Sequence, residues 1–140
     1  MDYRGATIIA DYGHNPDAIR ALVQAVDAMP GNKRSVVISG AGDRRDQDII
    51  EQTRILGAAF DEVILYQDAC QRGRADGEVL ALLRQGLEGA PRTRYSTEIH
   101  GEFAAIDHAL ERLAPGDLCL VLVDQVEEAL AHLQQRIASV

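Results

Sequence analysis

Short apolar runs alternate with amphipathic stretches along the whole chain. Four of the runs are mostly β-branched or aliphatic, which is typical of strands buried on both faces of a parallel sheet; they cover residues 7–12, 35–39, 60–66 and 118–123. A shorter, more polar run at 93–97 predicts a strand near a sheet edge. The stretches between the runs carry apolar residues at helical spacing, which predicts helices over 16–29, 46–59, 78–87, 102–113 and 126–137.

The order of these patterns predicts the fold class. Strand and helix alternate five times, and the connections are too long for β-hairpins. Such alternation favours right-handed crossovers and a mainly parallel sheet. We therefore expect one α/β domain over residues 1–140, a three-layer Rossmann-like fold with about five or six strands and helices on both faces. Residues 1–5 are interpreted as the end of an edge strand.

Composition restricts the partners of this domain. The formal net charge is −8, from 22 acidic and 14 basic residues, which opposes nonspecific binding to nucleic acid or to an anionic membrane. No apolar run approaches the roughly 20 residues that span a bilayer, and the N-terminus has no signal-peptide pattern. Cys70 and Cys119 form no metal-ligand spacing and indicate reduced thiols. We therefore expect a cytoplasmic protein.

The first candidate site is the corner that follows the first buried strand, because ligands bind beyond the carboxyl ends of strands in an open sheet. Asp11, His14 and Asn15 lie there, and Pro16 occupies the first helical position. A carboxylate can accept from ribose hydroxyls, a histidine can donate to a phosphate, and a helix start can hold an anion. The alternative is structural, with Asn15 as a helix cap and His14 as a surface loop residue. Chemistry alone leaves both interpretations open.

The second candidate site follows the next strand, where Gly40 and Gly42 precede Asp43, Arg44 and Arg45. The glycines allow a close approach of backbone to a ligand. Arginines suit carboxylate or phosphate, and they oppose the dipole of the helix that starts here. The stretch is neither a Walker A loop nor a complete dinucleotide fingerprint. The structural alternative is that Asp46 caps the helix and the arginines are solvated.

Other polar side chains carry weaker signals. Arg72 and Arg74 lie in the longest predicted loop, which suits closure over an acidic ligand. Asp124 follows the last strand and can join the same crevice. The remaining histidines suggest nothing beyond solvated positions; they are His100, His108 and His132.

The stretch Asp11-Tyr12-Gly13-His14-Asn15-Pro16 resembles the Asp-x-x-His-Asn-Pro motif that opens the C-terminal domain of Mur ligases and folylpolyglutamate synthetases. The stretch 40–46 strengthens this resemblance. The loop 68–77, with Arg72-Gly73-Arg74, is similar to the equivalent segment of cyanophycin synthetases. The resemblance extends from Arg4 to about Asp124.

The resemblance implies an ATP-dependent amide-bond ligase. In such enzymes ATP phosphorylates a substrate carboxylate, and the amine of an incoming amino acid attacks the acyl phosphate. A central domain supplies the phosphate loop, the Mg²⁺ ligands and a modified lysine. The C-terminal domain contacts the nucleotide and helps to bind the amino acid. The resemblance assigns nucleotide contacts to Asp11, His14 and Asn15, and substrate contacts to Asp43, Arg44, Arg45, Arg72 and Arg74.

The chain also departs from the family pattern. It has no Walker A motif, and Lys33 is its only lysine. We therefore expect the central ATPase domain to be absent, with no catalytic residue and no metal ligand within the 140 residues. ATP and Mg²⁺ would serve the full-length ligase only.

Rival interpretations remain. One is a stand-alone, non-catalytic module that binds an acidic metabolite or a partner protein. Another is a flavodoxin-like or other nucleotide-binding regulator, which the missing phosphate loop and the aromatic content of 4% disfavour. The sequence leaves self-association open.

Overall fold

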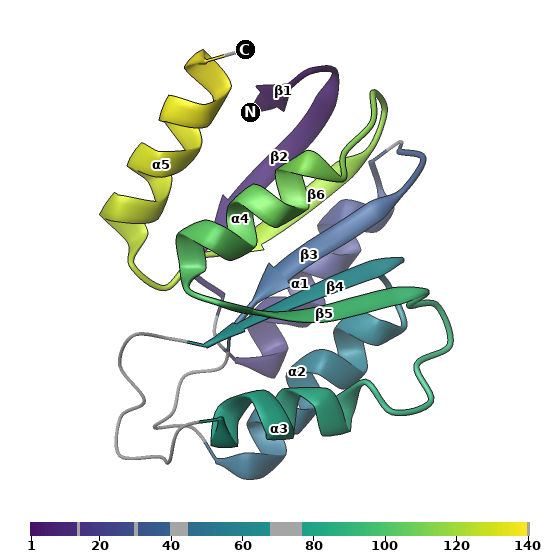
Figure 1. Ribbon diagram of the computed structural model, residues 1–140. Helices are drawn as coiled ribbons and strands as arrows, with labels where there is room; N and C mark the ends of the chain where they lie inside the picture. The colour runs from purple at the N-terminus through teal and green to yellow at the C-terminus, as the bar shows by residue number, and fades with distance from the viewer. Residues whose placement is uncertain (14, 30, 40–44, 68–76, 140) are drawn as a thin grey trace.

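The computed structural model describes residues 1–13, 15–29, 31–39, 45–67 and 77–139. These residues form one six-stranded sheet with the strand order β1-β2-β6-β3-β4-β5 (Figure 1). The strands are β1 (Asp2–Tyr3), β2 (Ala6–Asp11), β3 (Arg34–Ile38), β4 (Glu62–Gln67), β5 (Tyr95–His100) and β6 (Leu118–Leu122). All neighbours are parallel except β1, which pairs antiparallel with β2. The predicted α/β class, the mainly parallel sheet and the edge position of the first residues are confirmed.

The last strand determines which strand ends are neighbours. β6 lies between β2 and β3, with Leu120 in register with Ile9 on one side and with Val36 on the other. After β2 the chain skips the central position and forms β3, and it then adds β4 and β5 outward on the same side. It finally returns to the centre, where β6 fills the position between β2 and β3. Because all five parallel strands point the same way, the corners after them meet at one edge of the sheet.

Five helices cover the two faces of the sheet, as predicted. They are α1 (Pro16–Asp27), α2 (Asp46–Gly57), α3 (Glu78–Gly86), α4 (Glu102–Glu111) and α5 (Val126–Ala138). Figure 1 shows α4 in front of the sheet and α1 behind it. The two hydrophobic cores place α5 on the same face as α4, and α2 and α3 on the same face as α1. Within the described ranges no helix is both long and apolar enough to cross a membrane.

Each face has its own hydrophobic core. The core behind the sheet joins α1, α2 and α3 to β3, β4 and β6, and its largest buried side chains are Ile19, Ile38, Ile49, Leu56, Phe60, Leu65 and Leu83. The core in front joins α4 and α5 to the alternate residues of the same strands, and its largest buried side chains are Ile8, Ile64, Tyr66, Ile106 and Leu110. Successive strand residues thus serve opposite cores, which explains the continuous apolar runs in the sequence.

Two details differ from the prediction. Phe103 has the spacing of a core residue of α4, but it is 40% exposed, because it lies in the first turn of the helix and stacks on the His132 ring at 4.7 Å. β2 is not buried on both faces. Thr7 is exposed and Ile9 is half-buried at the margin of the rear core, so the rear face of this strand is incompletely covered.

The sole lysine belongs to an ionic cluster at the amino ends of the strands. Lys33 Nζ lies 3.3 Å from the Glu62 carboxylate and 3.7 Å from Asp117. Arg112 binds Glu62 through two hydrogen bonds of 3.0 Å. This cluster lies at the opposite end of the sheet from the corners after the strands. Lys33 therefore stabilises the fold there and lies far from the candidate sites.

Candidate functional site

The corner after β2 is held by short-range hydrogen bonds. The backbone N–H of Gly13 donates to Asp11 Oδ2 (2.9 Å), and the backbone N–H of Ala18 donates to Asn15 Oδ1 (2.9 Å). Asn15 has extended backbone, with φ −137° and ψ 159°, and Pro16 follows in the first helical turn. The capping role of Asn15 is therefore confirmed. His14 lies outside the described residues, and the nucleotide contacts of all three side chains stay predictions.

Gly13 brings this corner close to the first helix. A β-carbon at this buried position would lie 3.0 Å from Leu22 Cδ1 and 3.3 Å from Asp11 Oδ2. Such distances are tighter than ordinary van der Waals contact. Glycine therefore lets the chain turn tightly into α1 and keeps the Asp11 carboxylate folded back over the turn.

The corner after β3 is described from Arg45 onward. Arg45 occupies the N-cap of α2 without a side-chain cap bond, so the prediction that Asp46 caps this helix is wrong. The Arg45 guanidinium donates two hydrogen bonds of 3.2 Å to Asp48, and its side chain is 79% exposed. The hydrogen bond with Asp48 and the negative charge of that carboxylate raise the pKa of Arg45. Asp43 and Arg44 lie outside the described residues, together with Gly40 and Gly42.

A cavity of about 460 Å³ joins the two corners. It lies between the starts of α1 and α2 and is lined by Asn15, Pro16, Asp17, Arg20, Gln47, Asp48 and Glu51. Arg20 lies 3.1 Å from Asp17 on its own helix and 3.7 Å from Glu51 on α2. The structure thus brings Asn15 together with the helix start that Arg45 caps. We call this space the α1–α2 cavity.

A second cavity lies at the carboxyl ends of β4, β5 and β6. It has a volume of about 480 Å³ and is lined by Tyr66, Gln67, His100, Gly101, Glu102, Phe103, Ala104, Asp124 and Gln125. The suggestion that Asp124 joins the crevice of the earlier corners is wrong, because Asp124 lines this second cavity and is not among the lining residues of the α1–α2 cavity. We call this space the α4–α5 cavity, because it opens between the first turns of those helices.

Glu102 organises the α4–α5 cavity. Its carboxylate accepts hydrogen bonds from the backbone N–H groups of Asp124 (2.8 Å) and Gln125 (3.2 Å). The buried Tyr66 hydroxyl lies 3.3 Å from the same carboxylate and donates to the carbonyl of Leu122 (2.9 Å). One side chain therefore ties the start of α4 to the loop that leads into α5. The sequence gives no signal for Glu102, since a lone glutamate in a first helical turn is ordinary.

Two histidines have partners that the sequence did not indicate. His108 Nε2 lies 3.0 Å from the Tyr95 hydroxyl, and His132 Nε2 lies 2.7 Å from Asp107. The prediction of merely solvated positions is therefore wrong for both. His100 is exposed, but it lines the α4–α5 cavity.

The remaining candidates concern the loop after β4 and metal binding. Arg72 and Arg74 lie outside the described residues. In the part of the chain that the structure covers, no three His, Cys, Asp or Glu side chains are grouped so that they could hold a metal ion. The described residues therefore do not fit a metal centre of their own.

The fold and the two cavities define a class of protein, a mainly parallel α/β domain with cavities at the carboxyl edge of its sheet, which is where open sheets of this kind bind ligands. Comparison with known proteins identifies the family. The model of the Mur ligase, glutamate ligase domain family matches residues 1–123. This chain belongs to that family.

The relatives are longer proteins. Cyanophycin synthetase from Synechocystis sp. is 35% identical over 129 residues, which cover 91% of this chain and 14% of that enzyme. Among solved structures, a UDP-N-acetylmuramoyl-L-alanyl-D-glutamate–2,6-diaminopimelate ligase superposes with a TM-score of 0.78 at 22% identity, over 97% of this chain and 31% of that chain. FolC from E. coli in complex with ADP gives 0.68 at 22% identity, over 94% of this chain and 29% of that chain. The present chain thus spans less than a third of each of these proteins.

Proposed function

We propose that this chain is the C-terminal domain of an ATP-dependent amide-bond ligase of the cyanophycin synthetase type. Such a ligase joins a carboxylate, activated by ATP as an acyl phosphate, to the amine of an incoming amino acid. This domain contributes nucleotide contacts and part of the amino-acid site. It forms no amide bond alone, because the chain contains no phosphate-binding loop.

The α1–α2 cavity is the observation that supports this proposal most. The starts of α1 and α2, at Asn15 and Gln47, border one space at the carboxyl edge of the sheet, and Arg45 lies next to this space at the N-cap of α2, bound to the lining residue Asp48. One corner offers a helix start with Asn15 as its cap, and the other offers an exposed guanidinium. Helix starts and guanidinium groups both favour anionic ligands. A nucleotide phosphate or a substrate carboxylate fits the two helix starts and the guanidinium groups of Arg20 and Arg45, whereas the lining carboxylates Asp17, Asp48 and Glu51 oppose an anion elsewhere in the cavity.

The side chains at the first corner take distinct roles in this proposal. Asp11 Oδ2 accepts from Gly13, so Oδ1 is the atom that we assign to a ribose hydroxyl. Asn15 already caps α1, so we assign it the positioning of the helix start rather than a direct bond to the ligand. His14 is assigned to a phosphate on the basis of the motif.

Substrate binding falls to the arginines. Arg45 is exposed and, among the described residues, its guanidinium binds Asp48 through Nε and Nη2, so the opposite edge can bind a carboxylate ligand. We assign the same role to Asp43, Arg44, Arg72 and Arg74. ATP supplies the phosphoryl group that activates the carboxylate, and we assign its Mg²⁺ ligands to the central domain.

A chimeric enzyme tests the proposal. The equivalent domain of the Synechocystis cyanophycin synthetase is replaced by this chain. The rate of ADP release is then measured at varied concentrations of ATP and of the incoming amino acid, which gives a KM for each. We expect Asp11→Asn to raise the KM for ATP. We expect Arg45→Gln to raise the KM for the amino acid or the carboxylate acceptor by about ten- to a hundredfold, which corresponds to a lost charged hydrogen bond of about 1.5–3 kcal/mol.

Arg84→Gln is the matched control. Arg84 is an exposed arginine in the last turn of α3 and pairs with Glu98 at 3.3 Å. Its replacement removes the same positive charge, and neither Arg84 nor Glu98 lines either of the two cavities, so both KM values should stay unchanged. An active chimera in which Asp11→Asn and Arg45→Gln behave like Arg84→Gln would refute the residue assignments. The nucleotide role would be refuted if the backbone amide NMR signals of residues 11–17 in a folded chimera do not shift when ATP and Mg²⁺ are added.

A further inference from the structure

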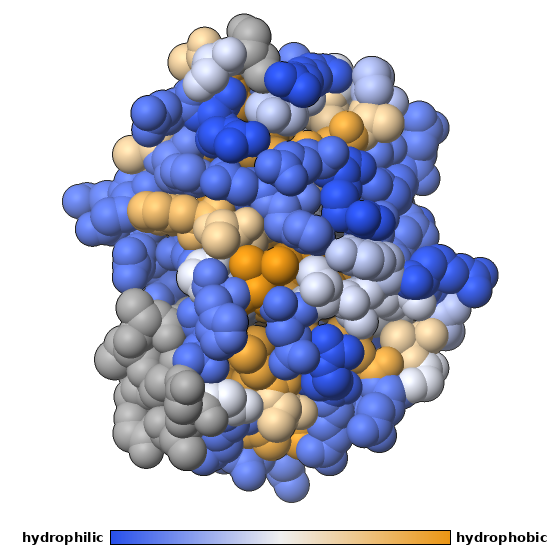
Figure 2. All heavy atoms as spheres, viewed as in Figure 1, coloured by the Kyte–Doolittle hydropathy of each residue, from blue (hydrophilic) through white to orange (hydrophobic). Residues whose placement is uncertain are grey.

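α5 packs less deeply than α4, the other helix on the same face of the sheet. Two of its 13 residues are fully buried, Ala129 and Leu133, whereas α4 buries four of its ten. Figure 1 shows α5 at one side of the sheet, near β1 and β2. Its outward surface is mostly hydrophilic (Figure 2, upper left). Apolar burial, which is the main force that holds a surface helix on its domain, is therefore smaller for α5 than for α4.

Contacts with α4 hold the body of α5. His132 Nε2 lies 2.7 Å from Asp107 Oδ1, and Arg136 Nη1 lies 3.5 Å from the same oxygen. The His132 ring also stacks on Phe103, with an angle of 6° between the two planes. Phe103 and Asp107 are four residues apart, so they lie on one face of α4. One carboxylate, that of Asp107, therefore binds two side chains of α5.

The start of α5 is held separately. Glu102 accepts hydrogen bonds from the backbone N–H groups of Asp124 and Gln125, which precede α5. Asp124 and Gln125 also line the α4–α5 cavity. Glu102 and Asp107 thus attach different parts of α5, so the contacts of Asp107 can open while those of Glu102 remain.

Phe103 connects the body of α5 to the cavity. It is 40% exposed and lines the α4–α5 cavity, while its ring stacks on His132. If α5 moves away, Phe103 loses this partner and the wall of the cavity changes. The position of α5 and the filling of the cavity are therefore coupled.

We propose that α5 is a hinged lid of the α4–α5 cavity, with its base held by Glu102 and its body latched by Asp107. The lid opens as a unit about residues 124–125 while the sheet and the other helices stay folded. Opening exposes Ala129 and Leu133. It also widens the cavity, which lies between the first turns of α4 and α5, so that the open form admits a ligand larger than the closed space of about 480 Å³.

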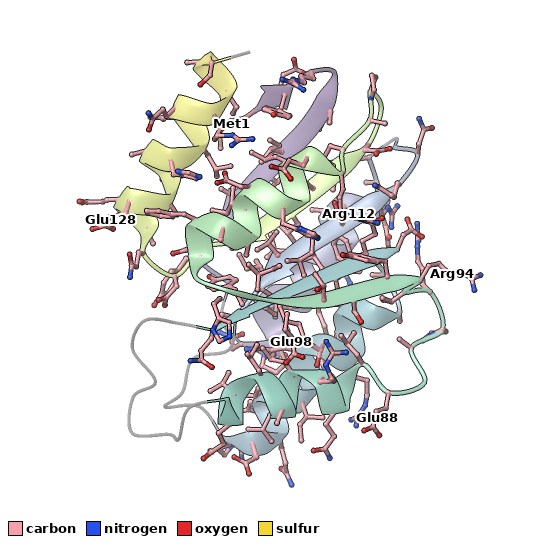
Figure 3. The ribbon with its side chains drawn as sticks, in the orientation of Figure 1. Met1, Glu88, Arg94, Glu98, Arg112 and Glu128 are labelled. Carbon is pink, nitrogen blue, oxygen red and sulfur yellow. The ribbon has the colours of Figure 1, made fainter. Side chains whose placement is uncertain are left out.

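Native-state hydrogen exchange tests the lid. The amides of residues 130–136 should exchange together, faster than those of α2 and with little dependence on low concentrations of urea, because this opening exposes little surface. The amide of Asp124 should stay protected when they open. Asp107→Ala should speed exchange at 130–136 about tenfold and leave α2 unchanged, because it removes the charged partner of two side chains. Glu88→Ala, at an exposed carboxylate in the turn after α3 (Figure 3), should change neither.

Three results would overturn the proposal. Exchange of α5 only at the rate of α2 would exclude a separate opening. A gradient of rates from residue 138 backward would show simple fraying of the helix end. Equal acceleration of α2 and α5 in Asp107→Ala, or none in either, would show that Asp107 is not a latch.

A fluorophore in the cavity wall tests the link between the lid and the cavity. The chain has no tryptophan, so Phe103→Trp adds a single one. Its emission should shift to longer wavelength when Asp107→Ala is added, and it should stay unchanged when Glu88→Ala is added. Unchanged emission in both would overturn the role of α5 as the lid of this cavity.

Discussion

The carboxylate of Glu102 accepts a hydrogen bond of 2.8 Å from the backbone N–H of Asp124, which lies 22 residues later in the chain. Glu102 is the first residue of α4, and Asp124 lies two residues before α5. The N-cap residue of α5, Gln125, makes no side-chain cap bond of its own. The Glu102 side chain of α4 therefore acts as an acceptor for the backbone N–H groups that lead into α5.

Replacement of Glu102 should loosen the start of α5. Glu102→Ala removes the acceptor for two backbone N–H groups, so we expect a loss of about 1–2 kcal/mol in the free energy of unfolding. Hydrogen exchange should speed up at the amides of Asp124 and Gln125. Glu128→Ala is the control, because Glu128 is an exposed carboxylate in the first turn of α5 and should cost only a few tenths of a kcal/mol. Equal losses in both variants would contradict this capping role.

Gly86 sets the contact between α2 and α3. A β-carbon there would collide with the carbonyl oxygen of Ile50 and the hydroxyl of Thr53, and would lie 3.1 Å from the nitrogen of Arg54. Glycine to alanine in an open helix position stabilises by roughly 0.5–1 kcal/mol. Here we expect the opposite sign, with Gly86→Ala destabilising by about 3 kcal/mol through overpacking.

Denaturant unfolding measures this effect. Gln85→Ala, an exposed neighbour in the same helix, should lie within about 0.5 kcal/mol of the wild type. If Gly86→Ala were as stable as Gln85→Ala, the close packing of these two helices would be disproved.

Most of the fold could be predicted because each strand and helix carries a local signal. The start of α1 at Pro16 is an example, since Asn15 and Pro16 are the preferred residues for those positions. The order of the strands had no such signal. β6 lies between β2 and β3 only because the crossover after β5 returns to the middle of the sheet. That choice depends on packing between distant segments.

The candidate site was predictable only where a motif marks it. The helix starts that follow the two corners, at Asn15 and Gln47, border one cavity, as their positions after parallel strands suggested. The α4–α5 cavity was not anticipated, and Asp124 lines it instead of the crevice at the earlier corners. Its central residue, Glu102, gains its importance from backbone groups that approach it from another loop. No local sequence pattern around Glu102 predicts this contact, because it depends on how the two segments pack.

Stability at acidic pH should depend on Glu62. Burial alone would raise the pKa of Glu62, but the hydrogen bonds from Arg112 and the charges of Lys33 and Arg112 outweigh it and hold the pKa below its usual value. The folded protein therefore binds a proton at Glu62 less readily than the unfolded chain. The resulting stabilisation is present above the ordinary glutamate pKa of about 4.5 and is lost as the pH falls through the folded-state value.

The measurement compares the wild type with Glu62→Gln in urea at pH values from 7 to 3. We expect Glu62→Gln to be less stable at neutral pH, because Arg112 loses a charged partner, and the two curves to converge as the pH falls. Glu88→Gln, an exposed carboxylate (Figure 3), should follow the wild-type curve. Parallel curves for Glu62→Gln and the wild type would show that Glu62 does not account for the acid sensitivity.

Cys119 should report on unfolding. It lies in the central strand β6 with no exposed surface, and burial raises the pKa of its thiol to about 12. The thiolate is the reactive form, so at pH 8 only about one Cys119 in ten thousand is ionised. In a Cys70→Ser background, we expect an aromatic disulfide reagent to modify the chain only as fast as the protein opens, with a rate that rises steeply with urea. Ser139→Cys, at an exposed position near the C-terminus, should react within seconds without urea. Equally fast labelling of Cys119 in the native protein would mean that the centre of the sheet opens far more often than its packing implies.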